Sequence, residues 1–306
     1  MKKILLLTCL IILIPFLVVN LFIKDDEIKF IYTSNMTVRV KQEDTDEIIK
    51  VPFEDYIVGV LAGEMPISFE LEALKAQAVA ARSYVMKKME YNKDKDYDVV
   101  DTVMNQVYLD NDYLKKAWKD DYTENINKIK TAVLETSNQY LVYDDKVIDA
   151  MFFSTSVGFT ENSEEVFTSK LPYLRSVSST CDEISPVFEV NYTFELENFY
   201  NKLNLDYQDE IILEKIDTTS TGRIKEIKIN NVLFTGSEVV SALNLKSNHF
   251  TIKQDGNQVY ITTKGYGHGV GMSQTGADSM AKQGSTYEDI IKHFYVGVEI
   301  KEINSI

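Results

Sequence analysis

The chain is organised around residues 61–88, which begin Leu61-Ala62-Gly63-Glu64-Met65-Pro66 and continue ISFELEALKAQAVAARSYVMKK. From residue 70 onward this stretch is rich in strong helix formers, and its alanines offer small surfaces for close packing. Pro66 suits the first turn of a helix, where its missing N–H leaves nothing unpaired. The sequence therefore predicts a long helix over residues 67–88, with Glu64 on a Gly-Pro-bounded turn directly before it.

Three charged residues of this stretch are candidates for chemistry. Lys75 and Arg82 are seven positions apart, so on a helix they share one face. Gly63 lets the backbone approach a ligand closely. An acid, Glu64, beside a fixed pair of cations suits a polar substrate in a groove. The plainer interpretation stays open: a glutamate before a helix often only complements the helix dipole, and the two cations often form a solvated face.

A second stretch, GYGHGVGMSQTGA at residues 265–277, is dense in glycine and carries one of only three histidines, His268. Glycines at this density allow the backbone to pass close to a ligand or to another segment. Residues 278–283 and 287–295 after it have helical character. His268 fits a general base or a sugar-binding donor, and it fits a structural histidine in a glycine turn equally well.

The bulk properties describe a folded, acidic protein. The chain has 306 residues, a length that suffices for one or two domains. Its 44% of hydrophobic residues and its 18 tyrosines indicate a folded protein. Its net charge of −15 argues against duplex nucleic acid or an anionic membrane surface as a partner. Two cysteines, Cys9 and Cys181, are too few for a disulfide framework.

The N-terminal segment predicts a membrane anchor. Residues 4–23 form a run of twenty uncharged positions, which is long enough to span a bilayer as a helix. Lys2 and Lys3 precede the run and acidic residues follow it, so we expect the N-terminus inside and the bulk of the chain outside the cytoplasm. A cleaved signal peptide is the alternative, but no Ala-x-Ala site follows the run.

The remaining pattern predicts an α+β fold with antiparallel strands in two extracytoplasmic lobes. Alternating segments at residues 28–40, 139–151, 187–196 and 224–232 indicate strands, and residues 252–262 indicate a hairpin around Asp255-Gly256-Asn257. The predicted units are an anchor (1–27), a core lobe with Glu64 and the central helix (28–165), a strand-rich second lobe (166–262), and a glycine/histidine segment with a C-terminal helix that completes the core lobe (263–306).

These motifs together resemble the stage II sporulation protein D family. The resemblance rests on several motifs in one order and covers nearly the whole chain after the N-terminal segment. The matching segments are residues 61–66, 72–82, Thr160-Glu161-Asn162-Ser163, Pro172-Tyr173-Leu174, 267–277 and His293-Phe294-Tyr295-x-Gly297.

The resemblance implies a lytic transglycosylase of peptidoglycan. Such an enzyme cleaves peptide-stripped glycan strands between MurNAc and GlcNAc and leaves a 1,6-anhydro-MurNAc end. One carboxyl suffices, because the sugar's own C6 hydroxyl captures the oxocarbenium-like centre, whereas ordinary glycosidases need a second carboxylate. Glu64 must then be protonated at neutral pH, and partial burial favours this by raising its pKa.

The resemblance also implies site residues. Glu64 matches the family's catalytic position, and Lys75, Arg82 and, less closely, Tyr173 match its other functional positions; His268 and Gln274 follow from their place in the second stretch. Each stripped muramic acid carries a lactyl carboxylate, so an acidic protein needs local cations to bind it. We expect those cations closer to substrate oxygens than to Glu64, whose pKa they would lower. The predicted substrate-binding residues are Lys75, Arg82, Tyr173, His268 and Gln274.

No metal or other cofactor is expected. Some members of the family bind a metal through Cys and His just before a Gln-x-Tyr triplet, but here residues 99–105, before Gln106-Val107-Tyr108, contain neither. Zinc sites require such ligands. The run at residues 271–276 has one residue too many for the nucleophile elbow of a serine hydrolase.

Two other functions stay open. One is a non-catalytic wall-binding activator of a cell-wall amidase, because related amidase enhancers share these motifs. The other is a hydrolase that uses water, with Glu161 as a candidate second carboxylate. By resemblance, the expected partners are peptidoglycan strands, an amidase that prepares them and a membrane scaffold protein. The expected place of action is the mother-cell membrane, facing the septal space during engulfment.

Overall fold

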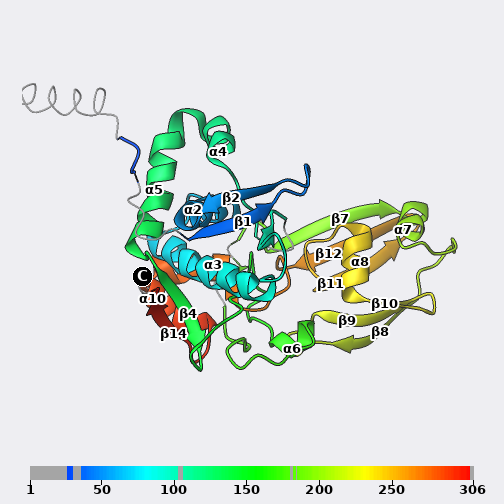
Figure 1. Ribbon diagram of the computed structural model, residues 1–306. Coiled ribbons are helices and arrows are strands. Elements are labelled where there is room, and N and C mark those ends of the chain that lie inside the picture. The colour runs from blue at the N-terminus through cyan, green and yellow to red at the C-terminus, as the bar shows by residue number, and fades with distance from the viewer. Residues whose placement is uncertain (1–25, 30–35, 103–105, 180–181, 184, 304–306) are drawn as a thin grey trace, which may run out of the picture.

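The computed structural model describes residues 26–29, 36–102, 106–179, 182–183 and 185–303. The predicted membrane anchor at residues 4–23, Cys9 and Cys181 lie outside these residues. Within the described part of the chain, no helix is both long enough and apolar enough to span a membrane. Helices and several small sheets alternate along the chain (Figure 1), which confirms the predicted α+β class.

The sheets are mostly antiparallel, with parallel pairing between β1 and β3 and between β6 and β13. The strand orders are β2-β1-β3, β10-β9-β8, β11-β12-β7, β13-β6 and β14-β4-β5. The helices are α2 (Phe53–Glu64), α3 (Leu71–Tyr91), α4 (Asn111–Trp118), the 3-10 helix η1 (Lys119–Asp121), α5 (Tyr122–Glu135), α6 (Ser163–Val166), α7 (Leu196–Lys202), α8 (Gly236–Leu243), α9 (Gln274–Lys282) and α10 (Tyr287–Phe294). The strands are β1 (Thr37–Lys41), β2 (Ile48–Pro52), β3 (Val99–Val100), β4 (Gln139–Tyr143), β5 (Lys146–Val147), β6 (Phe152–Phe153), β7 (Glu189–Glu195), β8 (Leu213–Thr218), β9 (Ile224–Ile229), β10 (Val232–Thr235), β11 (Phe250–Asp255), β12 (Gln258–Lys264), β13 (Met272–Ser273) and β14 (Glu299–Glu302).

Helix α3 is the centre of the larger hydrophobic core. It packs against α2, α5, α9, α10 and β4 (Figure 1). Its alanines are fully buried in this core, as their small size predicts for a helix that others approach on several sides. The fully buried alanines of α3 are Ala73, Ala76, Ala78, Ala80 and Ala81.

The start of α3 differs from the prediction of a helix over residues 67–88. Helix α2 ends at Glu64, and Met65 is extended with φ −120° and ψ 138°. The proline ring of Pro66 disfavours helical backbone at the residue before it, which ends α2 at this point. Residues 66–70 then form a turn, with the Phe69 N–H donating to the Pro66 carbonyl at 3.0 Å. Glu64 therefore ends one helix instead of lying directly before the next.

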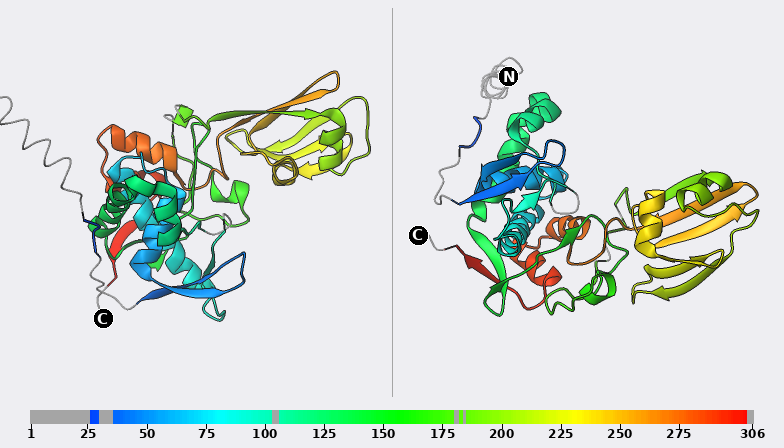
Figure 2. Two further views of the ribbon diagram at one scale, coloured as in Figure 1. Left: turned by 90° about the horizontal axis from the view of Figure 1, so that it is seen from above. Right: turned by 45° about the vertical axis from the view of Figure 1, so that its right-hand side comes forward.

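A second hydrophobic cluster lies in the part of the chain that runs from β7 to β12. It packs α7 and α8 against the sheets β11-β12-β7 and β10-β9-β8. This part extends to one side of the larger core in the two views of Figure 2. The predicted hairpin is confirmed: Asp255 pairs with Gln258, and Gly256 has a φ of +55° in the connecting turn. The predicted domain boundaries stay predictions.

The parallel pair β6 and β13 joins the second stretch that the sequence singles out to the segment at residues 152–153. Met272 pairs with Phe152 and Ser273 with Phe153. Helix α9 begins immediately after β13 and packs along α3. The Ser273 hydroxyl accepts the Gly276 N–H at 3.2 Å and so caps α9. This arrangement brings Gln274, the first residue of α9, to the end of α2.

Candidate active site

Glu64 lies at the C-terminal end of α2 in a partly buried position. Its Oε1 accepts the backbone N–H of Val107 at 2.8 Å. Burial raises the pKa of the Glu64 carboxyl, while this N–H and the side chain of Gln274 act in the opposite direction. No cation is among the groups that shift this pKa. Glu64 therefore has the environment that favours the protonated form of a carboxyl.

Two glycines of α2 position the donor to Glu64. A Cβ added to Gly59 would lie 2.5 Å from Tyr108 Cε2, and one added to Gly63 would lie 2.9 Å from Val107 Cγ1. Residues 107–109 can therefore lie directly against α2 only because both positions lack a side chain. The sequence predicted that a ligand could approach the backbone closely at Gly63. In the structure, residues 107–109 occupy that position instead. The spacing Gly59-x-x-x-Gly63 was the available signal for this contact.

Gln274 is brought to Glu64 by the second stretch, as its predicted role requires. Its side chain is only 6% exposed and contributes to the pKa of Glu64. Its Nε2 is directed at the Glu64 carboxyl and lowers the pKa of that group as a hydrogen-bond donor, although the contact lies outside ordinary hydrogen-bond geometry. A buried amide donor that the carboxyl satisfies only weakly gains from a ligand oxygen at this position.

Tyr84 and Asp149 extend the site beyond Glu64. Burial and the charges of Asp149 and Glu64 raise the pKa of Tyr84, whose hydroxyl is thus within electrostatic reach of both carboxylates. Asp149 is 7% exposed, its Oδ1 has no hydrogen-bond partner in the described chain, and burial raises its pKa. Tyr173 accepts the Asp149 backbone N–H on its hydroxyl at 3.1 Å. The predicted residue Tyr173 therefore fixes the segment that carries Asp149. Sequence reasoning missed Tyr84 and Asp149.

Arg82 lies in the interior of the fold. Its side chain is 0% exposed, and its Nη2 is 2.7 Å from Glu54 Oε2 on α2. The guanidinium also donates to the Thr136 hydroxyl at 3.1 Å and to the Val133 carbonyl at 2.8 Å. These contacts join α2, α3 and the end of α5. We therefore assign Arg82 a structural role.

Lys75 is also engaged by the protein's own carboxylates. Its Nζ lies 2.6 Å from Glu72 and 2.5 Å from Glu135. The Tyr287 ring is 5.9 Å away, on α10. Helix α3 thus carries both predicted cations, as expected, but each is paired within the fold and neither is brought to Glu64.

His268 is held as a neutral imidazole. Its Nδ1 accepts the Val270 N–H at 3.0 Å, and its ring lies 5.8 Å from that of Phe153 and 5.5 Å from that of Phe167. Burial and, to a lesser extent, the positive charge of Arg223 lower the pKa of His268 to about 4. Of the two interpretations left open by the sequence, these contacts favour a structural histidine.

Glu161 forms a buried ion pair with Arg223. Its Oε1 is 3.0 Å from Nε of Arg223, and both side chains are 0% exposed. Arg223 directly precedes β9 and donates to the Gly267 carbonyl at 2.8 Å. The pair therefore joins the β7–β12 part to the core and to the glycine-rich stretch. A carboxylate held in this way is poorly placed to activate water. Sequence reasoning missed Arg223.

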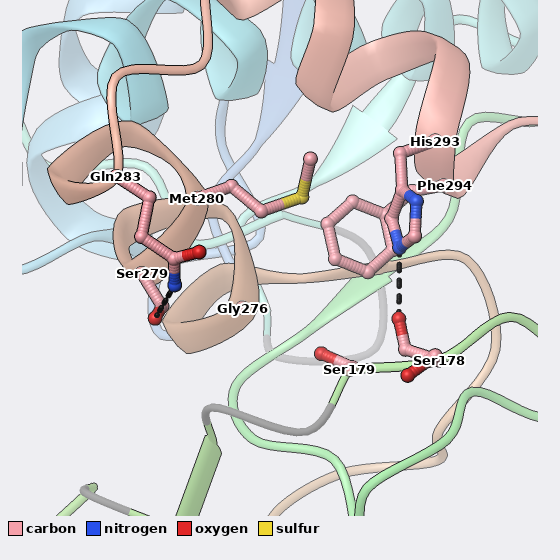
Figure 3. A pocket seen from close by; sticks show the side chains of 8 residues that line it. All are labelled: Ser178, Ser179, Gly276, Ser279, Met280, Gln283, His293 and Phe294. Atoms are coloured by element: carbon pink, nitrogen blue, oxygen red, sulfur yellow. Dashed lines mark hydrogen bonds between the residues drawn. The ribbon is translucent and has the colours of Figure 1, made fainter.

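A pocket of about 180 Å³ opens between α9 and α10 (Figure 3). One wall is apolar, with Met280 and Phe294, and His293 Nε2 is 2.8 Å from the Ser178 carbonyl oxygen. None of the predicted site residues lines this pocket. The lining residues are Ser178, Ser179, Gly276, Ser279, Met280, Gln283, His293 and Phe294.

The site has the composition of a general-acid centre: a partly buried carboxyl with a raised pKa, one backbone donor and the adjacent amide of Gln274. Among the described residues, no group of three or more His, Cys, Asp or Glu could hold a metal ion.

Comparison with known proteins places this chain in a family. The family model described as stage II sporulation protein, SpoIID, matches residues 41–143. The chain is 42% identical over 277 residues to stage II sporulation protein D of Bacillus amyloliquefaciens, covering 89% of this chain and 80% of the relative. It is 39% identical to the protein of the same name in Bacillus subtilis strain 168, with 89% and 81% covered. The chain therefore belongs to the stage II sporulation protein D family.

A further relative bears a different name. The amidase enhancer of Bacillus subtilis strain 168 is 30% identical over 302 residues, covering 79% of this chain and 40% of the relative.

Proposed function

We propose that this sporulation protein is a lytic transglycosylase, which cleaves peptide-stripped glycan strands of peptidoglycan between MurNAc and GlcNAc during septal wall thinning and engulfment. The observation that carries the proposal is Glu64, whose partial burial raises its pKa while no cation opposes the shift. A carboxyl with a raised pKa keeps its proton to higher pH and can donate it to a leaving group.

The reaction needs only this one carboxyl. Glu64 donates its proton to the glycosidic oxygen as the bond from that oxygen to C1 of MurNAc breaks. The C6 hydroxyl of the same MurNAc then bonds to C1 and returns a proton to Glu64. No water enters, so no second carboxylate is required. The Val107 N–H, 2.8 Å from Oε1, stabilises the carboxylate between the two proton transfers.

Gln274 is assigned to the substrate. Its Nε2 is satisfied only weakly by the Glu64 carboxyl, so it can donate to a sugar oxygen next to the cleaved bond. His268, held neutral by its contacts, supports the glycine-rich stretch that leads into α9.

Location and partners complete the proposal. Residues 4–23 would anchor the chain in the mother-cell membrane with the site outside the cytoplasm. An amidase would strip the peptides from the strands first, and a membrane scaffold protein would hold the two activities together. A second function, activation of that amidase, is favoured by the 30% identical relative named amidase enhancer.

Product analysis tests the proposal. The full-length chain and its Glu64→Gln form would be incubated with amidase-treated peptidoglycan, and the released sugars identified by mass spectrometry. Glu70→Gln is the matched control, because Glu70 is exposed and belongs to the turn after α2. We expect anhydro products from the native and control proteins and none from Glu64→Gln. Unchanged cleavage by Glu64→Gln would refute the assignment. An absence of cleavage by all three, with faster amidase action in their presence, would favour activation instead.

A further inference from the structure

Lys88 differs from the other cations of helix α3. Lys75, Arg82 and Lys87 each have a carboxylate oxygen within 2.8 Å. Lys88 has no such partner among the described residues, and its Nζ lies 4.8 Å from the centroid of the Tyr84 ring. The aromatic face holds the ammonium by a cation–π contact and leaves its hydrogen-bonding capacity for a ligand.

Tyr84 connects this ammonium to the candidate site. Tyr84 is four residues before Lys88 on the same helix, so the two side chains are neighbours. The charge of Glu64 contributes to the pKa of Tyr84, whereas Lys88 is not among the groups that shift the pKa of Glu64. The Tyr84 ring also lies 6.3 Å from the ring of Phe152, which pairs with Met272 just before Gln274. Lys88 therefore stacks on a residue of the candidate site without being among the groups that shift the pKa of Glu64.

Asp149 also interacts with Lys88 through its charge. Lys88 and then Lys87 lower the pKa of Asp149 against the effect of burial. No ion pair within 4.0 Å joins Asp149 to either lysine, and its Oδ1 lacks a partner in the described chain. The charge of Asp149 therefore attracts the Lys88 ammonium, but the two groups do not form an ion pair.

Peptide-stripped glycan carries the group that such a cation recognises. Removal of the peptide by an amidase exposes the lactyl carboxylate of muramic acid, and a chain with a net charge of −15 repels it unless a local cation intervenes. We propose that the ammonium of Lys88 binds this lactyl carboxylate and so selects glycan strands whose peptides have been removed. The inference rests on the proposed substrate, and it replaces Lys75 and Arg82 by Lys88 as the residue that recognises its charge.

Binding is the test, because it does not depend on cleavage. The full-length chain carrying Glu64→Gln would be titrated with fluorescently labelled, amidase-treated strands at low salt. The same strands with their lactyl carboxylates converted to neutral amides form the second ligand. We expect Lys88→Met to weaken binding of the carboxylate strands about tenfold and to leave binding of the amide strands unchanged. Lys87→Met is the matched control, since Lys87 is paired with Glu90, and it should bind both ligands normally.

Three outcomes would overturn the inference: equal weakening for both strands, no weakening for either, or the same selective loss in Lys87→Met. If Lys88→Met lowers the melting temperature, Lys88→Arg decides, because it keeps the charge and should retain the preference for carboxylate strands. Failure of the native chain to cleave would count against the proposed reaction and leave this binding result interpretable. Cleavage with no effect of Lys88 would count only against the inference.

Discussion

Replacing Gly63 by alanine tests how Glu64 is positioned. In an ordinary helix this change stabilises by about 1 kcal/mol. Here the new Cβ would lie 2.9 Å from Val107 Cγ1 and 3.1 Å from the Val107 carbonyl oxygen. Overpacking of this kind costs about 1–3 kcal/mol. If the segment moves away, the 2.8 Å bond from the Val107 N–H to Glu64 is also lost, at about 0.5–1.5 kcal/mol for a neutral acceptor.

The expected net effect of Gly63→Ala is a loss of about 1–3 kcal/mol in the free energy of unfolding, measured by urea denaturation. Cleavage should fall about 10- to 100-fold, because the acid is displaced from its productive geometry. Val107→Ala removes Cγ1, so the double variant should recover part of the lost stability. A Gly63→Ala protein that is more stable than the native chain and fully active would refute the account of α2 given above.

Three further changes test individual carboxylates and cations. Because burial raises the folded pKa of Glu64, the stability that its protonated form contributes is fully present below the unfolded value of 4.5 and is lost as pH rises through the folded pKa. Glu64→Gln should therefore gain stability relative to the native chain as the pH rises from about 4 to about 8. The gain should be about 1.4 kcal/mol for each pH unit that separates the folded pKa of Glu64 from the unfolded one. Denaturation curves at several pH values measure it, and a stability difference that does not depend on pH would contradict this. Arg82→Met leaves Glu54 without its partner and should lower the free energy of unfolding by about 3 kcal/mol or more. A variant of normal stability that binds glycan more weakly would show instead that Arg82 binds the substrate. Glu161→Gln strands the buried Arg223 and should destabilise by about 3–5 kcal/mol, seen as a lower melting temperature; lost hydrolysis at unchanged stability would instead make Glu161 a catalytic base.

Local patterns in the sequence predicted the elements well. The alanine-rich run predicted α3, and alternation with a central glycine predicted the β11–β12 hairpin, because these signals depend on neighbours in the chain. The predicted start of α3 was wrong, since the effect of Pro66 on Met65 outweighed its suitability for a first helical turn.

Tertiary pairing decided the candidate site, and it was only partly predictable. The place of Gln274 in the glycine-rich motif assigned it to the site of Glu64, although the two residues are far apart in the sequence. Nothing in the spacing of Lys75 and Arg82 showed that Glu135 and Glu54 would neutralise them. Periodicity assigns a residue to a face of its helix but does not say which element covers that face.

The most direct test of the central claim is the fate of water in the reaction. Amidase-treated strands would be cleaved by the full-length chain in heavy-oxygen water, and the ends of the products would be weighed by mass spectrometry. Capture by the C6 hydroxyl predicts anhydro-MurNAc ends that contain no heavy oxygen, formed only when Glu64 is present. Reducing MurNAc ends that each carry one heavy oxygen would show that water attacks, and would contradict a mechanism in which Glu64 acts alone.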